Sequence, residues 1–379
     1  MKFIHLSDLH IGKRVHEYSM IEDQEHILNE IVRIIDDEKP NGVLIAGDIY
    51  DKSVPAAEAV QLFDAFLARL AKRDLNVFVI SGNHDSPERI AFGSEIMKNS
   101  KVFLSPVYRG QVNPITLKDE YGQIDVYLLP FLRPSHVKQF YPDEEISSYT
   151  DAVRVAIEKM NVNQERRNIL VTHQFVTGAS SCESEEPISV GGSDQVDAGV
   201  FSPFDFVALG HIHGPQNIAG GKIRYCGTPL KYSFSEVNHK KSVTVLEFKG
   251  KGDLSVKEIG LTPKREMLEL KNQFSTLISR DFYENENTDA YIHITLTDED
   301  DIPDAIGKLR SIYPNIMKLD YDNTRTQRDS TIEVSAGAEE KKPVELFAEL
   351  FKAQNNTDLS DVQRGFVSTL IAEIWEDAN

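Results

Sequence analysis

Cysteine and long apolar runs are scarce in this sequence of 379 residues. Its two cysteines, Cys182 and Cys226, are too few for a disulfide framework or a cysteine-rich zinc module, so we expect two buried or incidental thiols. No apolar stretch approaches the ~18 residues that a membrane span needs. These absences predict a soluble, cytoplasmic protein with no membrane partner. The chain length favours two or three domains.

Basic residues are also fewer than acidic residues in this sequence. The chain contains 41 lysines and arginines against 60 aspartates and glutamates, a net charge of −19. This balance argues against a simple nucleic-acid-binding module, because such modules present positive surfaces to phosphate. The charge is uneven: residues 201–250 hold six basic and three acidic side chains, whereas residues 263–379 carry a strong acidic excess. The acidity is therefore concentrated away from the motifs described below.

Short β-branched segments alternate with helix-period segments in the first half of the chain, a pattern typical of a layered α/β sheet. We expect helices at Met20–Glu38 and Ala56–Arg73. Strands are expected at Lys2–Leu6, Gly42–Ala46, Asn76–Ile80, Ile124–Leu129, Asn168–Thr172 and Phe204–Leu209. Shorter strands at Lys222–Tyr225, Ser242–Phe248 and Leu254–Glu258 indicate a second sheet packed on the first.

The pattern changes near Thr262. A small α/β domain is expected from the segments Glu266–Lys271, Ala290–Thr297, Ile302–Tyr313 and Asn315–Tyr321. Pro303 fits the first turn of the helix in that domain. A charged linker, Ser335–Pro343, then leads to two amphipathic helices, Val344–Lys352 and Asp361–Glu376, with Ser360 as N-cap of the second.

The two last helices carry an apolar stripe each, which fits either packing within their own domain or binding of a partner. The stripes consist of Val344, Phe347, Leu350 and Phe351, and of Val362, Phe366, Leu370, Ile374 and Trp375. Partner binding is slightly favoured, because a terminal unit beyond a charged linker has few residues with which to bury them.

Potential metal ligands follow the predicted strands in five separate motifs. The series comprises Asp8 and His10, Asp48, Asn83 beside His84, His173, and finally His211 and His213. A single Asp-x-His or His-x-His is usually an ordinary surface or core pair. Because strand ends at one edge of an α/β sheet converge on a crevice, five such motifs predict one shared site.

The residue types indicate which chemistry this site performs. Carboxylate, carboxamide and imidazole ligands without thiolate favour Mn²⁺, Fe or Zn²⁺ at an open site over a closed structural zinc site. Asp48 is the best candidate for a carboxylate that bridges two ions. Two ions ~3.5–4 Å apart clamp both oxygens of an in-line phosphoryl displacement. The sequence therefore predicts a two-metal phosphoesterase with two divalent cations as cofactors.

The motif series resembles the calcineurin-like metallophosphoesterase superfamily, and further segments resemble its SbcD family of bacterial nuclease subunits. These segments are Asp48–Asp51, Gly178–Glu185, Gly191–Ser193, Ala208–Gln216 and Cys226–Glu236. The resemblance implies a calcineurin-like two-sheet α/β sandwich with helices on its outer faces. It also implies a nuclease domain at residues 1–262, a small α/β capping domain at 263–335, and a linker with C-terminal helices at 336–379.

The resemblance assigns a role to each site residue. One ion would be held by Asp8, His10, Asp48 and His213, and the second by Asp48, Asn83, His173 and His211. His84 would be a catalytic group that is not a ligand and that stabilises the transition state or protonates the leaving oxygen. The Asp51 carboxylate would orient His84, although a charge at a helix N-terminus is the alternative for Asp51. Manganese is the expected metal.

Several side chains are candidates for contact with a nucleic acid. These are Lys13, Arg14, Lys52, Arg89, Lys231 and Tyr232, the last as a base-stacking ring. For any one of the basic residues, an ordinary solvated loop charge is about as good an explanation. The loop Gln174–Gly199 is long for a compact domain, which fits a lid or an interface.

The resemblance implies a Mn²⁺-dependent DNA nuclease that acts as an exonuclease on duplex ends and an endonuclease on single-stranded or hairpin DNA in repair, recombination and replication. Such proteins are homodimers, and their C-terminal region holds an SMC-like ATPase of the SbcC type. One alternative is a phosphatase or cyclic-nucleotide phosphodiesterase with the same site. A second alternative is a non-catalytic scaffold of the same fold.

Overall fold

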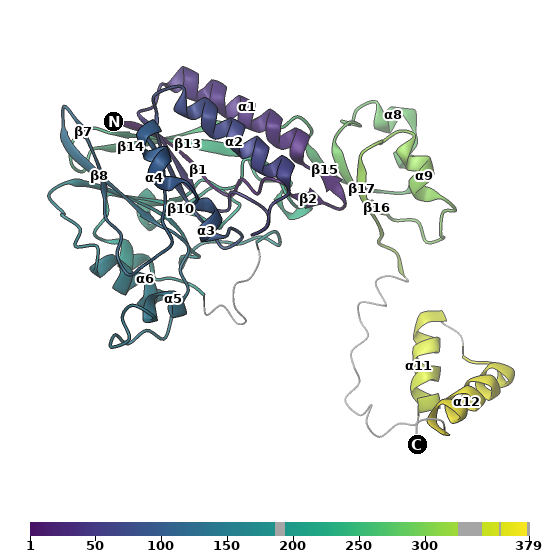
Figure 1. Cartoon of the computed structure of the whole chain (residues 1–379). Helices are drawn as coiled ribbons and strands as arrows, with labels where there is room; N and C mark the ends of the chain where they lie inside the picture. Colours follow the sequence, from purple (N-terminus) through teal and green to yellow (C-terminus); the bar gives the residue numbers. More distant parts are fainter. Residues whose placement is uncertain (186–193, 325–342, 356–357, 377–379) are drawn as a thin grey trace. The chain divides into compact units, whose positions relative to one another are not determined.

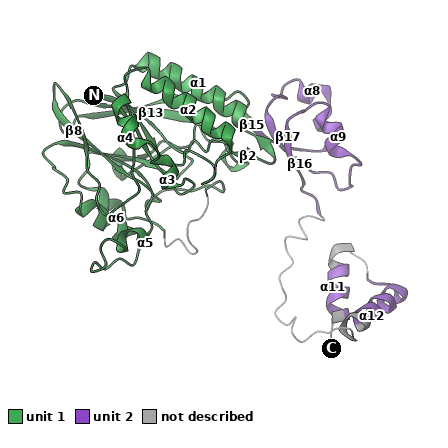
Figure 2. Cartoon of the chain, viewed as in Figure 1, with its two compact units in different colours: residues 1–267 green, residues 268–379 purple. Residues whose placement is uncertain are grey.

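The computed structural model describes residues 1–185, 194–324, 343–355 and 358–376. The chain divides into two units, Met1–Met267 and Leu268–Asn379 (Figure 2). In the described part of the chain, every helix is too short or too polar to cross a membrane.

Two six-stranded sheets form the framework of the first unit. The first sheet has the order β14-β13-β1-β4-β5-β6, with β1, β4, β5 and β6 parallel and β13 and β14 antiparallel to their neighbours. Its strands are β1 (Lys2–Leu6), β4 (Gly42–Ala46), β5 (Asn76–Ile80), β6 (Val102–Leu104), β13 (Ser242–Phe248) and β14 (Leu254–Gly260).

The second sheet has the order β11-β12-β10-β9-β8-β7. Strands β8, β9, β10 and β12 are parallel, and the edge strands β7 and β11 are antiparallel. The strands are β7 (Ile115–Asp119), β8 (Gly122–Leu129), β9 (Arg167–His173), β10 (Phe206–Gly210), β11 (Gln216–Ile218) and β12 (Ile223–Tyr225). The central strands are apolar almost throughout, as expected for parallel strands with both faces covered.

The core lies between the two sheets. Phe3, Leu44 and Phe78 of the first sheet pack with Val171 and Ala208 of the second. Helices lie on the outer faces of the two sheets (Figure 1). The helices of this unit are α1 (Ile21–Glu38), α2 (Ala57–Ala71), α3 (Pro87–Ile90), α4 (Ser94–Met97), α5 (Pro134–Lys138) and α6 (Tyr149–Glu158), and β2 (Arg14–Val15) forms a hairpin with β3 (Tyr18–Ser19). The predicted two-sheet sandwich with outer helices is confirmed.

The expected distribution of strands between the sheets is wrong. We expected the strands before Gly214 in one sheet and the later ones in another, but β8, β9 and β10 belong to the second sheet, and β13 and β14 extend the first. The cause is that β13 pairs with β1, from Lys2↔Glu247 to His5↔Thr244. Strands of both sheets are buried on both faces, so their apolar pattern does not tell which sheet each one joins.

The second unit contains a three-stranded sheet covered by helices on one face. Its strands are β15 (Met267–Asn272), β16 (Tyr291–Leu296) and β17 (Ile316–Tyr321), and its helices are α7 (Phe274–Leu277), α8 (Arg280–Tyr283) and α9 (Ala305–Arg310). Ile292, Ile294 and Leu309 lie in its core. The prediction that Pro303 lies in the first helical turn is wrong, because α9 begins after Asp304, whose left-handed backbone (φ 51°) turns the chain into the helix.

Two helices end the described chain, α11 (Pro343–Asn355) and α12 (Asp361–Glu376), and they contact each other. Ser360 caps α12 as predicted: Gln363 N donates to Ser360 Oγ at 3.3 Å, and Ser360 N donates to Gln363 Oε1 at 3.0 Å. The predicted linker lies outside the described residues as far as residue 342, as do the side chains of Ile374 and Trp375.

Candidate metal centre

The predicted ligand residues follow strands of both sheets. Asp8 and His10 come after β1, Asp48 after β4, and Asn83 after β5, all in the first sheet. His173 ends β9, and His211 and His213 follow β10 in the second sheet. Because β1, β4 and β5 are parallel, as are β9 and β10, the carboxyl ends of these strands converge on one edge of the sandwich.

Main-chain hydrogen bonds hold these loops together. Asp8 N donates to Gly47 O at 3.0 Å, and His10 N donates to Asp48 O at 2.9 Å, so the loop after β1 runs beside the loop after β4. The second sheet is tied in by His211 N, which donates to Asp8 Oδ1 at 2.9 Å. The site is therefore built across the two sheets.

Four of the ligand residues have a left-handed backbone. The φ angles are 53° for Asp8, 43° for His10, 48° for Asp48 and 105° for His211. Side-chain-bearing residues rarely adopt this region, and the conformation costs on the order of 1–3 kcal/mol each where it is strained. Residues with such a conformation persist only where surrounding contacts hold the backbone, and they cluster at functional sites.

One group of ligand atoms surrounds Asn83. Its Oδ1 lies 2.9 Å from His173 Nε2 and 3.1 Å from His211 Nδ1, and His173 Nε2 lies 3.4 Å from Asp48 Oδ2. Two ligand atoms at right angles on one ion, each at ~2.1 Å, stand ~3 Å apart. His173 Nδ1 donates to Ala46 O at 2.9 Å, which leaves Nε2 available to an ion.

A second group consists of Asp8, His10 and His213, which offer ligand atoms that all lie within 4.8 Å of one another. His10 Nε2 lies 3.7 Å from Asp48 Oδ2, so this carboxylate oxygen is near both groups and would suit a ligand shared by two ions. Asp8 Oδ2 and His10 Nε2 are buried and have no hydrogen-bond partner among the described residues. Buried orphan ligand atoms of this kind fit a cation.

The electrostatics favour the cation-binding forms of His10, His211 and Asp48. Burial lowers the pKa of His10 and lowers that of His211 to about 3, so both imidazoles are neutral. Burial alone would raise the pKa of Asp48, but His173 and other nearby imidazoles hold it well below its usual range. Burial would lower the pKa of His173, yet Asp48 and Asp8 raise it to about 9. A bound cation would therefore release a proton from this histidine.

His84 lies beside the ligands. Its Nδ1 donates to the main-chain oxygen of Asp51 at 2.9 Å, and its Nε2 lies 4.0 Å from Asp48 Oδ2. We expected the carboxylate of Asp51 to orient the ring, but this hydrogen bond is to the main chain, and the carboxylate pairs with Lys13 Nζ at 2.8 Å. The tautomer of His84 is thus set by the backbone of the loop after β4.

Comparisons with known proteins identify the family of the chain. The family model described as calcineurin-like phosphoesterase matches residues 1–215, more than half of the chain. The D subunit of the nuclease SbcCD from Staphylococcus epidermidis is 32% identical over 382 residues, which cover 99% of this chain and 99% of that protein. The chain belongs to the SbcD family of calcineurin-like phosphoesterases. It is therefore a metal-dependent phosphoesterase, a hydrolase.

Three further matches of this SbcD-family chain are partial or distant. Residues 263–355 match the model described as type 5 capsule protein repressor C-terminal domain. A crystal structure of a Thermus thermophilus protein is 12% identical with a TM-score of 0.37, covering 68% of this chain and 98% of that one. A dimetal phosphatase from Danio rerio is 13% identical with a TM-score of 0.39, covering 69% and 96%.

Asp85 belongs to the site, although the sequence patterns assigned no role to it. Its buried carboxylate accepts from Ile49 N at 3.1 Å, Tyr50 N at 3.0 Å and Gly82 N at 2.9 Å. It thereby joins the loop after β4, which carries Asp48, to the loop after β5. Its place in the Gly-Asn-His-Asp motif was the available signal, but its hydrogen bonds depend on tertiary structure.

The candidate DNA contacts differ in their surroundings. Lys52 and Arg89 are exposed, and Arg14 is exposed beside Glu17. Lys13 pairs with Asp51, and Lys231 pairs with Glu266 at 2.6 Å. Tyr232 does not fit the expected base-stacking role, because it is only 3% exposed and its hydroxyl donates to Leu9 O at 2.6 Å. Its ring packs edge-on against His10, where it supports a ligand.

The long loop predicted at Gln174–Gly199 reaches the metal ligands through its described part. Glu185 Oε1 accepts from His213 N at 2.7 Å, and Ser184 Oγ lies 2.8 Å from His213 Nδ1. Cys182 in the same loop and Cys226 behind the site are both free thiols, as expected. The loop therefore contributes to the surroundings of His213.

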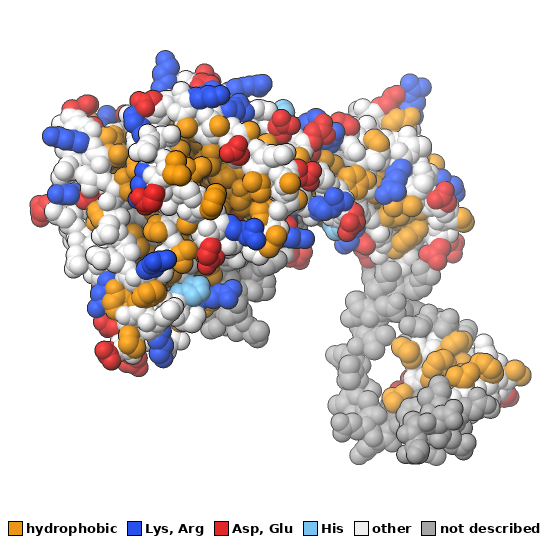
Figure 3. Space-filling model, viewed as in Figure 1, with side chains coloured by type: hydrophobic (Ala, Val, Ile, Leu, Met, Phe, Trp, Pro, Cys, Tyr) orange, Lys and Arg blue, Asp and Glu red, His pale blue; other side chains and the backbone are white. Residues whose placement is uncertain are grey.

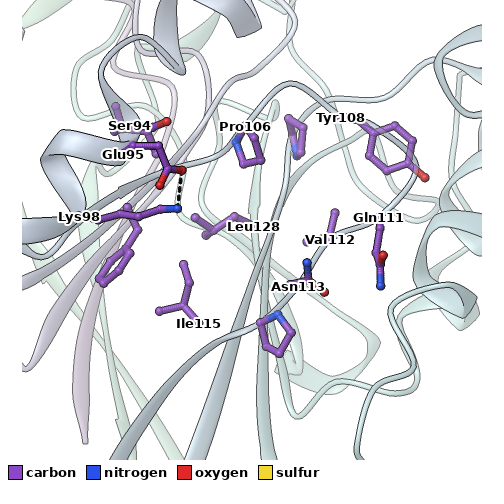
Figure 4. A pocket seen from close by; sticks show the side chains of 14 residues that line it. Ser94, Glu95, Lys98, Pro106, Tyr108, Gln111, Val112, Asn113, Ile115 and Leu128 are labelled. Atoms are coloured by element: carbon purple, nitrogen blue, oxygen red, sulfur yellow. Dashed lines mark hydrogen bonds and ion pairs between the residues drawn. The ribbon is translucent and has the colours of Figure 1, made fainter.

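A cavity of about 280 Å³ lies elsewhere in this unit (Figure 4). It opens beside α4 and β6, with Leu128 and Ile115 in its wall and the ion pair of Glu95 and Lys98 at its side. It shares no lining residue with the ligand set, so it is separate from the metal centre.

Proposed function

We propose that the chain is a Mn²⁺-dependent DNA nuclease, an exonuclease on duplex ends and an endonuclease on single-stranded or hairpin DNA. It would work as one component of an SbcC–SbcD complex in DNA repair, recombination and replication. The observation that carries this proposal is the double ligand set that shares Asp48 Oδ2, with His84 4.0 Å away, in a chain similar over its whole length to a protein named as a nuclease.

The bound ions would supply the nucleophile and neutralise charge on the reacting phosphate. Asp8, His10, Asp48 and His213 would hold one ion, and Asp48, Asn83, His173 and His211 the other. With both ring nitrogens protonated, His84 would donate the Nε2 proton to the leaving 3′-oxygen, because its Nδ1–H is bonded to Asp51 O and cannot face the substrate. General acid catalysis of this kind contributes about 10²–10⁴-fold to the rate.

The substrate would be held only in part by this chain. Lys52 and Arg89 are exposed near the metal motifs and are the best candidates for phosphate contacts. Residues 263–335 would form a capping domain, but their acidic excess weakens any separate grip on DNA. We infer that an SMC-like ATPase of the SbcC type shares the work of holding DNA.

Binding of that ATPase is assigned to α11 and α12. Among the described side chains of these helices, five large apolar ones are exposed: Phe347, Leu350, Val362, Phe366 and Leu370. Val362 and Phe366 are 83% and 67% exposed on α12. An exposed apolar helix face of this kind marks an interaction surface, because a partner that covers it removes the apolar side chains from water. A helical segment of the large ATPase would suit such a face.

A homodimer is also part of the proposal. Apolar side chains gather on the face that carries α2, α3 and α4 (Figure 3). Phe92 and Ile96 are 84% and 77% exposed there, and Val60 on α2 is exposed as well. Two copies that meet through this face would bury these side chains around a two-fold axis.

The substrate class can be tested by comparing two reactions of the full chain with Mn²⁺: cleavage of an end-labelled DNA hairpin and hydrolysis of an aryl phosphate. We expect hairpin cleavage to dominate. Activity on the aryl ester alone would favour a phosphatase or cyclic-nucleotide phosphodiesterase, and activity on neither substrate would favour a scaffold.

A further inference from the structure

A buried ion pair lies behind the metal ligand His213. Glu236 has no solvent exposure, and the side chain of Lys241 is 4% exposed. Removing two charges from water costs several kcal/mol per ion before their attraction is counted. The pair therefore needs a set of hydrogen bonds around it, and these bonds converge on His213.

Lys241 and Glu236 contact both the main chain and the ring of this histidine. Lys241 Nζ donates to His213 O at 3.0 Å, to Thr228 Oγ1 at 2.6 Å and to the Glu236 carboxylate. The other carboxylate oxygen, Glu236 Oε1, lies 3.2 Å from His213 Nδ1. The ammonium thus fixes the carboxylate, and the carboxylate accepts the Nδ1 proton of the ring.

The hydrogen bond to Nδ1 determines which nitrogen can face an ion. A neutral imidazole carries one proton, and a carboxylate at Nδ1 keeps the proton there and leaves Nε2 as ligand. Lys241 Nζ donates to the Glu236 carboxylate, and an ionised carboxylate is a stronger acceptor than a neutral group.

Ser184 Oγ is a second group near Nδ1, at 2.8 Å. A hydroxyl can donate or accept, so it satisfies either tautomer of the ring. An ionised carboxylate accepts only, so Glu236 alone specifies the tautomer. This difference predicts unequal effects when each of the two groups is removed.

We propose that Glu236, held by Lys241, is a positioning residue that fixes His213 for the ion shared with Asp8 and His10. The inference rests on the metal site of the proposed nuclease but not on DNA as its substrate. The two carboxylate oxygens of Glu236 face His213 Nδ1 and Lys241 Nζ, so Glu236 would act through His213. Its effect is therefore confined to one of the two ion sites, since the ligands Asn83, His173 and His211 make no described contact with it.

The test is titration of metal-free full-length protein with Mn²⁺, followed by calorimetry and by the electron paramagnetic resonance signal of the bound ions. The unmodified protein is expected to bind two ions. Glu236→Gln keeps the shape but places an amide at Nδ1, and we expect one ion to bind about 10–100-fold more weakly while the other is unchanged. Unchanged binding of both ions by a folded variant would overturn the proposal.

Three further variants separate positioning from stability. Glu236→Asp shortens the side chain and keeps its charge, so it should show the same selective loss and serves if Glu236→Gln does not fold. Ser184→Ala should weaken Mn²⁺ binding less than about threefold, because the carboxylate still specifies the tautomer.

Asp119→Asn removes a carboxylate paired with the buried Arg167 and should lower the thermal midpoint with both ion sites intact. A larger loss in Ser184→Ala than in Glu236→Gln would refute the assignment.

The role of Glu236 and the proposed nuclease function can fail independently of each other. A protein that binds two ions but cuts no DNA would contradict the nuclease proposal and leave the role of Glu236 standing. A Glu236→Gln variant with two unaltered sites would contradict the role of Glu236, whatever the protein cuts.

Discussion

At the scale of single residues, several candidate ligands have unfavourable backbone conformations that neighbouring hydrogen bonds maintain. Asp8, His10 and Asp48 all have φ angles near 50°, and the hydrogen bonds from Asp8 N and His10 N to the neighbouring loop hold two of them there. Burial removes these carboxylates and imidazoles from water, which is unfavourable unless other groups or a cation interact with them. We infer that bound metal stabilises this arrangement.

Gly210 shows how closely the two sheets approach at the site. A Cβ atom at this position would lie 1.9 Å from Ala46 O and 2.6 Å from His173 Nδ1. We expect Gly210→Ala to push the second sheet away from β4, to lower stability by about 3 kcal/mol or more, and to reduce Mn²⁺ binding. Thermal unfolding and metal content measure both effects.

Gly260 provides the matched control at the end of β14, because a Cβ atom there meets nothing within 4 Å. Gly260→Ala should change stability by less than about 1 kcal/mol. Equal free energies of unfolding for the two alanine variants would show that the close approach at Gly210 does not contribute to stability.

The sequence was sufficient to predict which seven candidate ligands come together at one site, but not what surrounds them. Asp48 and His173 are identifiable because a ligand residue at the end of an apolar strand is a local pattern. Glu236 and Asp85 act through hydrogen bonds to residues far away in the chain or to main-chain N–H groups, which no local pattern reports. Tyr232 was misjudged for the same reason: its burial beside His10 is a tertiary fact.

At the scale of elements, local signals defined the strands, and long-range pairing decided their sheets. The predicted bounds of β1, β4, β5 and β13 agree with the structure, because each is a short apolar run between turn residues. Their arrangement depends on β13 joining β1 antiparallel, a contact between the two ends of the first unit. Periodicity carries no information about such pairing.

The terminal helix α12 allows a test of the assigned partner. Val362→Glu and Phe366→Glu place a charge on the exposed apolar face, and we expect each to weaken capture of the large ATPase at least ~10-fold. Co-purification of the two proteins from cells that express both measures this effect. The far-ultraviolet circular dichroism should not change.

Ile306→Glu on α9 is the control, because Ile306 is an exposed apolar residue of the same unit outside the two terminal helices. It should leave capture intact. If Ile306→Glu abolishes capture and Phe366→Glu does not, the partner binds the sheet-containing part of the second unit instead.

At the scale of the whole molecule, assembly would reconcile the net charge of −19 with the proposed DNA substrate. Two bound ions would supply positive charge only at the reacting phosphate, so binding of a long polyanion would need help from elsewhere. A large partner and a second copy of the chain would both provide it. We therefore expect DNA affinity to rise strongly when the large ATPase is present.

The proposed dimer makes a separate prediction. Phe92→Asp or Ile96→Asp introduces a charge at the exposed apolar face, and we expect the mass in light scattering to fall from two chains to one at micromolar concentration. Tyr121→Asp, at an exposed turn between β7 and β8, should remain dimeric. A monomeric unmodified chain would contradict the dimer, as would dimeric Phe92→Asp and Ile96→Asp variants.

The central claim is that this metal centre cuts DNA with His84 as proton donor. The most direct measurement is the Mn²⁺-dependent cleavage rate of an end-labelled hairpin by the unmodified chain and by His84→Gln, each with its co-purified large partner. We predict about a 10²–10⁴-fold loss in His84→Gln, with two Mn²⁺ ions still bound. Undiminished cleavage by His84→Gln would contradict the account.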